Sequence, residues 1–262
     1  MSRPIWRLLD TLPAPGAWNM AVDEALLASV REGGLPTLRF YRWSPACLSL
    51  GRNQPARDRY NLEAIQTRGL DVVRRPTGGR AVMHDRELTY SLAVPDGLLG
   101  SPRATYAAVN RALAAGLRRL GVPAELAPRG GGRVPAPSLA PCFKEPVEGE
   151  IVAGGRKLVG SAQYRKDGVV LQHGSLLLDG DQEEVRSLLR EPEREARSVP
   201  PATLAMYRNP LPSWEALTHA LAAGWEETSG VVLCQNQLSP GEQLCARRLA
   251  ERYHAPAWTW HH

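Results

Sequence analysis

The spacing of apolar residues along the chain changes between a helical period and a strand period. Residues 18–30 are the clearest helical stretch, and Gly33 and Gly34 follow them as a stop signal. The apolar residues of this stretch recur at intervals of three and four, which is the repeat of one face of an α-helix. These positions are Val22, Ala25, Leu26 and Val30. The pattern therefore predicts an amphipathic helix over residues 18–30.

Shorter runs of apolar, β-branched and aromatic residues, bounded by Gly, Pro, Asp or Asn, predict β-strands. The predicted strands are residues 5–9, 37–43, 46–50, 70–75, 81–84 and 88–94. A further patterned stretch, residues 150–179, contains two hairpin signals, Gly154-Gly155 and Asp167-Gly168. Because such pairs favour tight turns between antiparallel strands, this stretch predicts three consecutive strands.

Capping signals mark the starts of three other predicted helices. Ser101 followed by Pro102 predicts the start of a long helix, because serine caps a helix and proline suits its first turn. Asp181 with Glu184, and Ser239 with Glu242, have the spacing of a capping box. The predicted helices are residues 62–68, 101–120, 181–190, 213–228 and 239–253.

Strands and helices that do not alternate regularly predict an α+β fold, with a mostly antiparallel or mixed sheet and helices packed around it. At 262 residues the chain is long enough for one large domain. We expect a single domain over residues 1–262, with its core at about 18–230 and a C-terminal helix and tail at 239–262. Residues 128–141, with four prolines and three consecutive glycines, are predicted to be a loop that borders a site or is mobile.

Composition excludes several classes of protein. Hydrophobic residues make up 43% and charged residues 23% of the chain, which is typical of a soluble globular protein. No apolar run approaches the roughly 20 residues of a membrane span, and the first ten residues lack a signal-peptide pattern. We therefore expect a cytoplasmic protein that does not bind membranes. The net charge of +5 favours an acidic partner. Nucleic acid is one candidate, although the chain has no Lys/Arg-rich run, and a small acidic carrier protein is equally compatible with the charge. The prediction adopted is a carrier protein and no nucleic acid.

The four cysteines are scattered, with neither a CxxC pair nor metal-ligand spacing, so no metal site is expected. Cys47, Cys234 and Cys245 are predicted to be buried structural thiols. Cys142 is different because Lys157 follows it by fifteen residues, near the start of the patterned stretch 150–179. A thiol and an amine brought together can move an acyl group through a thioester, since the ammonium favours the nucleophilic thiolate.

Three segments contain further candidate chemistry. Consecutive Gly78 and Gly79 follow a predicted strand and let the backbone approach a ligand closely, although an ordinary turn has the same sequence. Lys157 precedes apolar residues in a predicted strand, where it faces either the core or solvent. Gln172, His173 and Ser175 interrupt an apolar strand, and buried polar groups need partners, so they predict a hydrogen-bond network or a pocket wall. His84, taken alone, fits a structural role better than a catalytic one.

Together, and in this order, these segments resemble one family. The stretches that carry the resemblance are residues 75–82, 84–85, 87–91, 141–143, 155–163 and 171–175. The chain is similar to the lipoate-protein ligase A / biotin ligase / octanoyltransferase superfamily, and within it to the LipM-type octanoyl-acyl carrier protein:protein N-octanoyltransferases. The resemblance runs from about Trp18 to Trp260 and implies a catalytic domain like that of the biotin and lipoate ligases.

The resemblance implies an acyl transfer in lipoate assembly. Octanoyl arrives as a thioester on acyl carrier protein, passes to Cys142 as an acyl-enzyme, and leaves on a lysine of a lipoyl domain such as glycine cleavage H protein. Lys157 lowers the thiol pKa and helps to deprotonate the incoming amine. No cofactor is needed, because the thioester is already activated.

By the same resemblance, the substrate-binding residues lie on three of the matched stretches. The acyl-pocket loop contributes Gly78, Gly79, Ala81 and His84, with Arg75, Arg80 and Val82 on the same stretch. Gly160, Ser161 and Ala162 surround the thioester carbonyl, where backbone N–H groups hold the oxyanion. His173 and Gly174 belong to the third stretch.

Alternatives to this reaction remain open at this point. ATP-dependent lipoate ligases of the superfamily have a third glycine where this chain has Arg80, and they need no cysteine at position 142. Both differences favour the transferase. An ATP-dependent ligase, an amidotransferase that moves octanoyl or lipoyl between carrier domains, and a non-catalytic module that binds acylated carriers are the alternatives.

Overall fold

A computed structural model describes residues 2–128, 147–191 and 199–261. Predictions that fall on other residues, Cys142 and most of the loop over residues 128–141 among them, lie outside this part of the chain. The elements in chain order are β1 (Ile5–Asp10), α1 (Gly16–Arg31), β2 (Thr37–Tyr41), β3 (Cys47–Leu50), α2 (Leu62–Thr67), β4 (Asp71–Arg74), β5 (Val82–His84), β6 (Glu87–Pro95), α3 (Pro102–Arg119), β7 (Ala124–Leu126), β8 (Ile151–Ala153), β9 (Arg156–Lys166), β10 (Val169–Leu177), α4 (Glu184–Ser187), the 3₁₀ helix η1 (Leu204–Met206), α5 (Trp214–Ser229), β11 (Val232–Asn236), α6 (Pro240–His254) and α7 (Pro256–Thr259).

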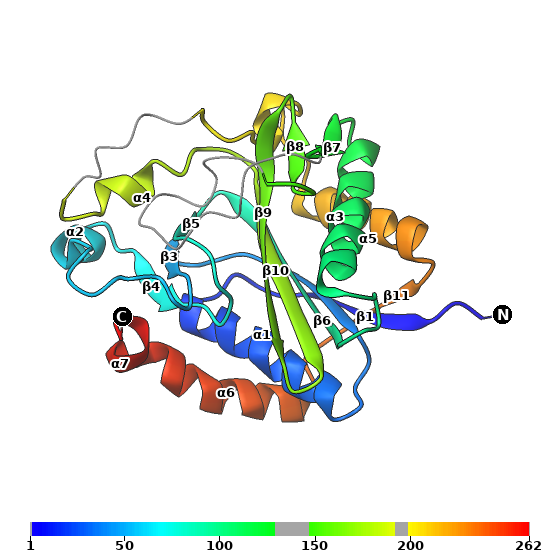
Figure 1. The fold of residues 1–262 in the computed structure, drawn as a ribbon, viewed down its shortest axis with the longest axis horizontal. Coiled ribbons are helices and arrows are strands. Elements are labelled where there is room, and N and C mark those ends of the chain that lie inside the picture. Colours follow the sequence, from blue (N-terminus) through cyan, green and yellow to red (C-terminus); the bar gives the residue numbers. More distant parts are fainter. Residues whose placement is uncertain (1, 129–146, 192–198, 262) are drawn as a thin grey trace.

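Eight strands form one mixed sheet in the order β11-β1-β2-β6-β10-β9-β8-β7. β11, β1 and β2 run parallel, and the remaining neighbours are antiparallel. The long β9–β10 hairpin lies at the centre of the view in Figure 1. Both hairpins of the stretch 150–179 turn at the predicted pairs, Gly154-Gly155 and Asp167-Gly168. The predicted α+β fold with a mostly antiparallel or mixed sheet is therefore confirmed.

Helices cover both faces of this sheet, α1 and α6 on one face and α3 and α5 on the other (Figure 1). The alternation of residues along β6 explains this arrangement, since successive side chains of a strand point to opposite faces. Leu88, Tyr90, Leu92 and Val94 belong to the core beneath α3 and α5. On the other face, Ala93 belongs to the core beneath α1 and α6, and Ser91 donates a hydrogen bond to Asp23 of α1 at 2.7 Å.

A second sheet of three strands, in the order β4-β3-β5, lies beside the large one and has its own core. The segment that links β4 to β5 contains the predicted loop with Gly78 and Gly79. Its neighbour is Gly51, at the end of β3, where a Cβ atom would lie 1.9 Å from the carbonyl oxygen of Gly79. Only a glycine at position 51 permits this approach. The loop with Gly78 and Gly79 therefore lies directly against the end of β3.

The predicted helix starts are partly confirmed. Ser101 caps α3 through its side chain, and Ser239 and Glu242 form the predicted capping box at α6. The capping box at Asp181 is wrong, because α4 spans only Glu184–Ser187 and has no side-chain cap. Gln182 explains the difference. Its amide exchanges hydrogen bonds of 2.8 and 2.9 Å with the backbone of Met83 in β5, which ties residue 182 to the small sheet.

The cysteine predictions are also partly confirmed. Cys47 is buried in β3, as predicted. Cys234 is exposed and Cys245 is half-buried, so the prediction of buried thiols is wrong for these two. Cys234 lies on β11, which is the edge strand of the large sheet and exposes most of its side chains. The apolar residues that precede Cys234 gave no sign of that edge position.

Among the helices of the described ranges, none combines the length and the apolar character needed to cross a lipid bilayer.

Candidate active site

A pocket of about 450 Å³, counting the space at its open mouth, lies where the loop between β4 and β5 faces β10 and β9. Most of the predicted substrate-binding residues line it. They are Arg75, Gly79, Val82, His84, Gly160, Ser161, Ala162, His173 and Gly174. Ser175, which was predicted to belong to a hydrogen-bond network or a pocket wall, also lines the pocket. Met20, Tyr41, Trp43, Ser49 and Thr89 complete the lining and were not predicted as site residues. The tertiary structure thus brings stretches 75–84, 160–162 and 173–174 to one place.

Three predicted residues of the loop are not in the lining. The carbonyl oxygens of Gly78 and Arg80 accept hydrogen bonds of 2.9 and 2.7 Å from the Arg75 guanidinium. The same guanidinium donates to the carbonyl oxygen and the hydroxyl of Ser49 at 3.0 and 3.1 Å. Ala81 is packed in the core of the small sheet. Arg75 therefore fastens the glycine loop to β3, and its own guanidinium is committed to protein oxygens.

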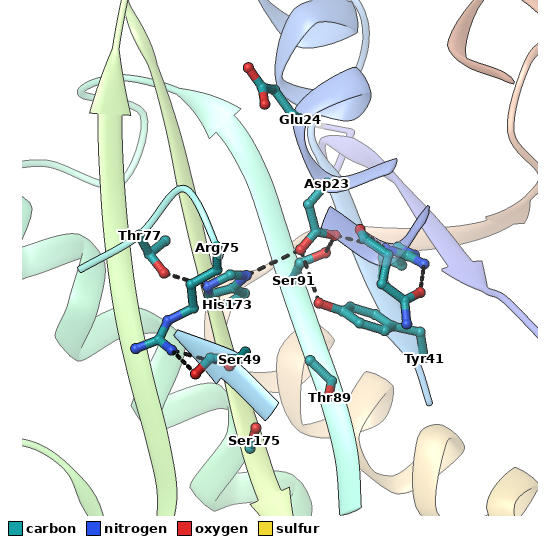
Figure 2. Close-up of polar contacts among 12 residues, drawn as sticks. Asp23, Glu24, Tyr41, Ser49, Arg75, Thr77, Thr89, Ser91, His173 and Ser175 are labelled. Atoms are coloured by element: carbon teal, nitrogen blue, oxygen red, sulfur yellow. Dashed lines mark hydrogen bonds and ion pairs between the residues drawn. The ribbon is translucent and has the colours of Figure 1, made fainter. Parts of the chain in front are cut away.

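A buried polar network lies behind the pocket on the α1 side (Figure 2). Asp23, on α1, accepts hydrogen bonds from Arg39 at 2.8 Å and from Tyr41 at 3.0 Å. Its oxygen Oδ2 lies 3.2 Å from Nδ1 of His173, and Nε2 of His173 lies 2.6 Å from the hydroxyl of Thr77. The network thus links α1, through His173 on β10, to the glycine loop. Glu24, the next residue, points away from it.

The titration of this network follows from burial and from its hydrogen bonds. Burial alone would raise the pKa of the Asp23 carboxyl, but the His173 hydrogen bond and the Arg39 guanidinium outweigh burial and lower that pKa. Burial lowers the pKa of His173, and the Asp23 carboxylate opposes this only in part. A neutral His173 with its proton on Nδ1 donates to Asp23 and accepts from the Thr77 hydroxyl, so both ring nitrogens are satisfied.

We expect the free energy of unfolding to fall as the pH drops below about 6.5, the ordinary pKa of histidine. Because the folded pKa of His173 is lowered, the unfolded chain takes up this proton first as the pH falls. Stability is therefore lost from about the ordinary pKa down to the folded pKa, and the lowered pKa of Asp23 adds a loss at lower pH. Urea unfolding between about pH 8 and pH 5 measures the decline. His173→Gln, which takes up no proton, should decline less steeply, and an equal slope would assign the acid sensitivity to other groups.

A second histidine links the small sheet to the large one. Nε2 of His84 lies 2.6 Å from the hydroxyl of Ser49, and its Nδ1 lies 2.7 Å from Oε1 of Glu87. Trp43 stacks on the His84 ring, with the ring centroids 4.0 Å apart. The hydroxyl of Ser175 donates to the same Glu87 oxygen at 3.0 Å. Ser49 and Glu87 were missed because each needs a partner from another strand to be recognised.

Backbone packs tightly where β10 passes β9 at the pocket. A Cβ atom on Gly174 would lie 2.3 Å from the carbonyl oxygen of Gly160 and 2.8 Å from the hydroxyl of Ser161. That hydroxyl accepts a hydrogen bond of 2.7 Å from Tyr90. The absence of a side chain at position 174 therefore lets residues 160 and 161 of β9 pack directly against β10.

Lys157 is buried in β9, 4% exposed, and it is not in the pocket lining. Its Nζ donates to Oε1 of Glu150 at 2.8 Å, and the Glu150 side chain is 8% exposed. Oε2 of Glu150 accepts from the backbone N–H of Val147 at 2.9 Å. The register of β8 against β9 shifts beside this pair, which marks a bulge, and bulges re-aim side chains. Sequence analysis missed Glu150, although it lies seven residues before Lys157 at the start of the same patterned stretch.

The predicted pairing of Cys142 with Lys157 falls on a residue outside the described ranges. The pocket has both apolar and hydrogen-bonding walls, and the N–H groups of its Arg75 guanidinium donate to carbonyl and hydroxyl oxygens of the protein. The walls of such a pocket suit a hydrocarbon chain with a polar head.

Comparison with known proteins gives concordant results. Residues 15–210 match the family "Lipoyl protein ligase A/B catalytic domain". The chain is 42% identical to octanoyltransferase LipM of Kyrpidia tusciae, over 97% of this chain and 98% of that protein. It is 50% identical to octanoyltransferase LipM of Moorella thermoacetica, over 75% of this chain and 74% of that protein. A solved structure of lipoate-protein ligase A bound with ATP superposes with a TM-score of 0.79 at 26% identity, covering 97% of this chain and 98% of that one.

Proposed function

Because the chain belongs to the lipoyl protein ligase A/B catalytic domain family, we propose that it is an octanoyltransferase of lipoate biosynthesis. It moves an octanoyl group from octanoyl-acyl carrier protein to a lysine of a lipoyl domain, and we place the reaction in the cytoplasm. The observation that carries the proposal is the similarity to octanoyltransferases named LipM over nearly the whole chain. Glycine cleavage H protein is the acceptor we put first.

The acyl group is expected to lie in the pocket between the glycine loop and β10. Apolar walls from Met20, Trp43 and Val82 suit the hydrocarbon chain. Gly160, Ser161 and Ala162, at the β9 side, are the residues that we assign to the carbonyl end. Arg75 and the Asp23–His173–Thr77 chain hold the loop in place, so these residues support the pocket by positioning its wall.

We assign the two chemical steps to Cys142 and Lys157. In the first step the Cys142 thiolate attacks the octanoyl thioester, the carrier thiolate leaves, and it takes a proton from the Lys157 ammonium. In the second step the acceptor amine attacks the acyl-enzyme, the Cys142 thiolate leaves, and neutral Lys157 takes the proton that the amine releases. Protons balance over the cycle, and no nucleotide is consumed because each step starts from a thioester.

The ion pair with Glu150 is consistent with the charged starting state of this cycle. An ammonium buried without a counter-charge would be costly, and the carboxylate at 2.8 Å supplies that charge. Glu150 thus fixes the position of the Lys157 Nζ in β9. A cation of this kind favours the thiolate form of a cysteine near it.

Incubation with octanoyl-acyl carrier protein in the absence of ATP, followed by intact-protein mass spectrometry, tests the proposal. The wild-type chain is expected to gain one octanoyl group, and Cys142→Ala is expected to gain none and to lose transfer to the lipoyl domain. Cys234→Ala is the matched control, since Cys234 is an exposed thiol and has no assigned role. An adduct on Cys142→Ala would remove the nucleophile from the proposal.

An ATP-dependent ligase is the second candidate, because the solved relative at 26% identity is a lipoate-protein ligase A bound with ATP. That activity predicts strict dependence on ATP with free octanoate or lipoate, and full activity in Cys142→Ala. An amidotransferase between carrier domains would instead use an octanoylated lipoyl domain as donor and would keep the need for Cys142. The same mass measurement with each donor in turn distinguishes the three.

A further inference from the structure

A groove with exposed arginines lies at the edge of the small sheet, away from the pocket lining. The segment between β3 and α2 forms one wall, and the C-terminal residues after α6 form the other. Its volume is about 870 Å³, including the space open to solvent. The residues with the largest side chains in its lining are Arg57, Tyr60, Leu62, Arg190, Trp260 and His261. In Figure 1, α2 and α7 lie at the same end of the molecule.

Two exposed arginines on the first wall segment have no counter-charge among the described residues. Arg57 lines the groove, and Arg59 lies two residues further along the same segment. Neither side chain has a hydrogen bond or an ion pair with any residue that the structure describes. Several exposed arginines elsewhere are paired with carboxylates. Examples are Arg68 with Glu184, Arg86 with Asp179, and Arg119 with Glu227. The groove therefore offers cations without counter-charges.

Positive charge outweighs negative charge on the segment that forms the first wall. Arg52, Arg57 and Arg59 lie on it, and Arg190 is tied to it by a hydrogen bond of 3.2 Å from its Nε to the carbonyl oxygen of Tyr60. Asp58 is the acidic residue among them, and the structure gives it no ion pair with a described residue. This wall of the groove attracts an anionic partner, and the attraction acts mainly by raising the association rate.

The same segment is continuous with the wall of the active-site pocket. The backbone N–H of Arg52 donates to the carbonyl oxygen of Thr77 at 2.8 Å, and Gly51 lies against Gly79 of the pocket lining. The second wall of the groove is anchored to the same region. Trp258 donates from Nε1 to the carbonyl oxygen of Arg74 at 2.9 Å, next to Arg75. A partner seated in the groove therefore lies beside the loop that closes the pocket.

We propose that this groove is the docking site of the acyl carrier protein that donates the octanoyl group, an inference that rests on the function proposed above. An acyl carrier combines an acidic surface with a phosphate-bearing arm that ends in the thioester. The unpaired arginines suit the acidic surface and the phosphate. Tyr60 and Trp260, with ring centroids 6.3 Å apart, give the groove an aromatic side for the rest of the arm.

The test compares two donors with the same acceptor. One is octanoyl-acyl carrier protein, and the other is octanoyl-pantetheine, which has the thioester but neither the carrier nor the phosphate. The variant is Arg57→Glu/Arg59→Glu. The matched control is Arg111→Glu/Arg208→Glu, because these arginines are also exposed and without an ion pair to a described residue, and they lie on α3 and after η1, outside the groove.

The ratio of kcat/KM for the carrier to kcat/KM for octanoyl-pantetheine is expected to fall about tenfold in Arg57→Glu/Arg59→Glu at low salt, through KM. The difference should shrink as salt screens the charges. The control should keep the wild-type ratio. An unchanged ratio in the groove variant overturns the proposal, as does an equal fall in the control. A rise in the KM of the acceptor with both donors overturns it too, because the groove would then bind the lipoyl domain.

Carrier binding without turnover separates this inference from the proposed function. Fluorescence anisotropy with a labelled octanoyl carrier measures affinity whether or not transfer occurs. Binding that weakens in the groove variant and not in the control supports the docking site, even if the wild-type chain proves to need ATP. Equal binding by all three proteins overturns it, even if octanoyl transfer is confirmed.

Discussion

Replacement of Lys157 by methionine is expected to reduce octanoyl transfer by about 10²- to 10⁴-fold, the range in which a positioned acid–base group contributes. Methionine keeps the apolar stem and removes the ammonium, so the carrier thiolate loses its proton source and the Cys142 thiol loses its cation. Single-turnover formation of the acyl-enzyme, followed by mass spectrometry, should show that the first step is slowed. The pH at which iodoacetamide alkylation of Cys142 is half-maximal should rise in the variant.

The ion pair with Glu150 complicates this experiment. Lys157→Met leaves the Glu150 carboxylate buried without the ammonium at 2.8 Å, and breaking a buried pair costs about 3–5 kcal/mol. The double variant Lys157→Met/Glu150→Gln removes both charges and is the control for stability. It should recover much of the free energy of unfolding while remaining as inactive as the single variant. Near-wild-type transfer by a folded double variant would remove Lys157 from the mechanism.

Asp23→Asn is expected to lower the free energy of unfolding by about 3–5 kcal/mol, because it removes one charge of a fully buried pair. The Arg39 side chain is 1% exposed and lies 2.8 Å from Asp23, so its charge would be left without a counter-ion in the interior. The two carboxylate oxygens of Asp23 now accept from four donors, on Arg39, Tyr41, Ser91 and His173. An asparagine would offer these donors a single acceptor oxygen. Urea unfolding near neutral pH measures the loss.

Asp85→Asn is the matched control, since Asp85 is an exposed aspartate whose nearest ion pair, with Arg86, is 3.8 Å long and solvent-exposed. Exposed pairs contribute about 0–1 kcal/mol, so its unfolding curve should stay close to that of the wild type. Because Asp23 reaches the glycine loop through His173 and Thr77, Asp23→Asn should also raise the KM for the donor. If Asp23→Asn proved as stable as Asp85→Asn, the buried Asp23–Arg39 pair would not contribute the stability that we infer.

The regular elements follow largely from local sequence. The predicted helix at residues 18–30, the caps at Ser101 and Ser239, and both glycine hairpins of the stretch 150–179 are present within a residue or two. These signals act over three or four positions, so they survive in any tertiary setting that does not oppose them. Where tertiary contacts do oppose them, as at Gln182 beside β5, the local prediction fails.

The candidate site was only partly accessible to the same reasoning. Arg75, Gly79, His84, Ser161 and His173, which the family resemblance marked as substrate-binding, line one pocket. Their role in binding stays a prediction. Trp43, Ser49 and Asp23 were missed, because each acts through a residue that is distant in the chain. Asp23 meets His173 across 150 positions, and no periodicity within a strand or helix encodes such a contact.

The order of apolar and polar residues was sufficient to predict the α+β class, the hairpins, and the helix caps at Ser101 and Ser239. These properties depend on the period of side chains along one segment and on turn geometry, both of which are local. The resemblance to the family rested instead on specific motifs. The partner of Lys157, the burial of Asp23 and the unpaired arginines beside the pocket depended instead on how separate segments pack. Packing decides them because burial and ion pairing depend on how side chains from separate segments meet in space.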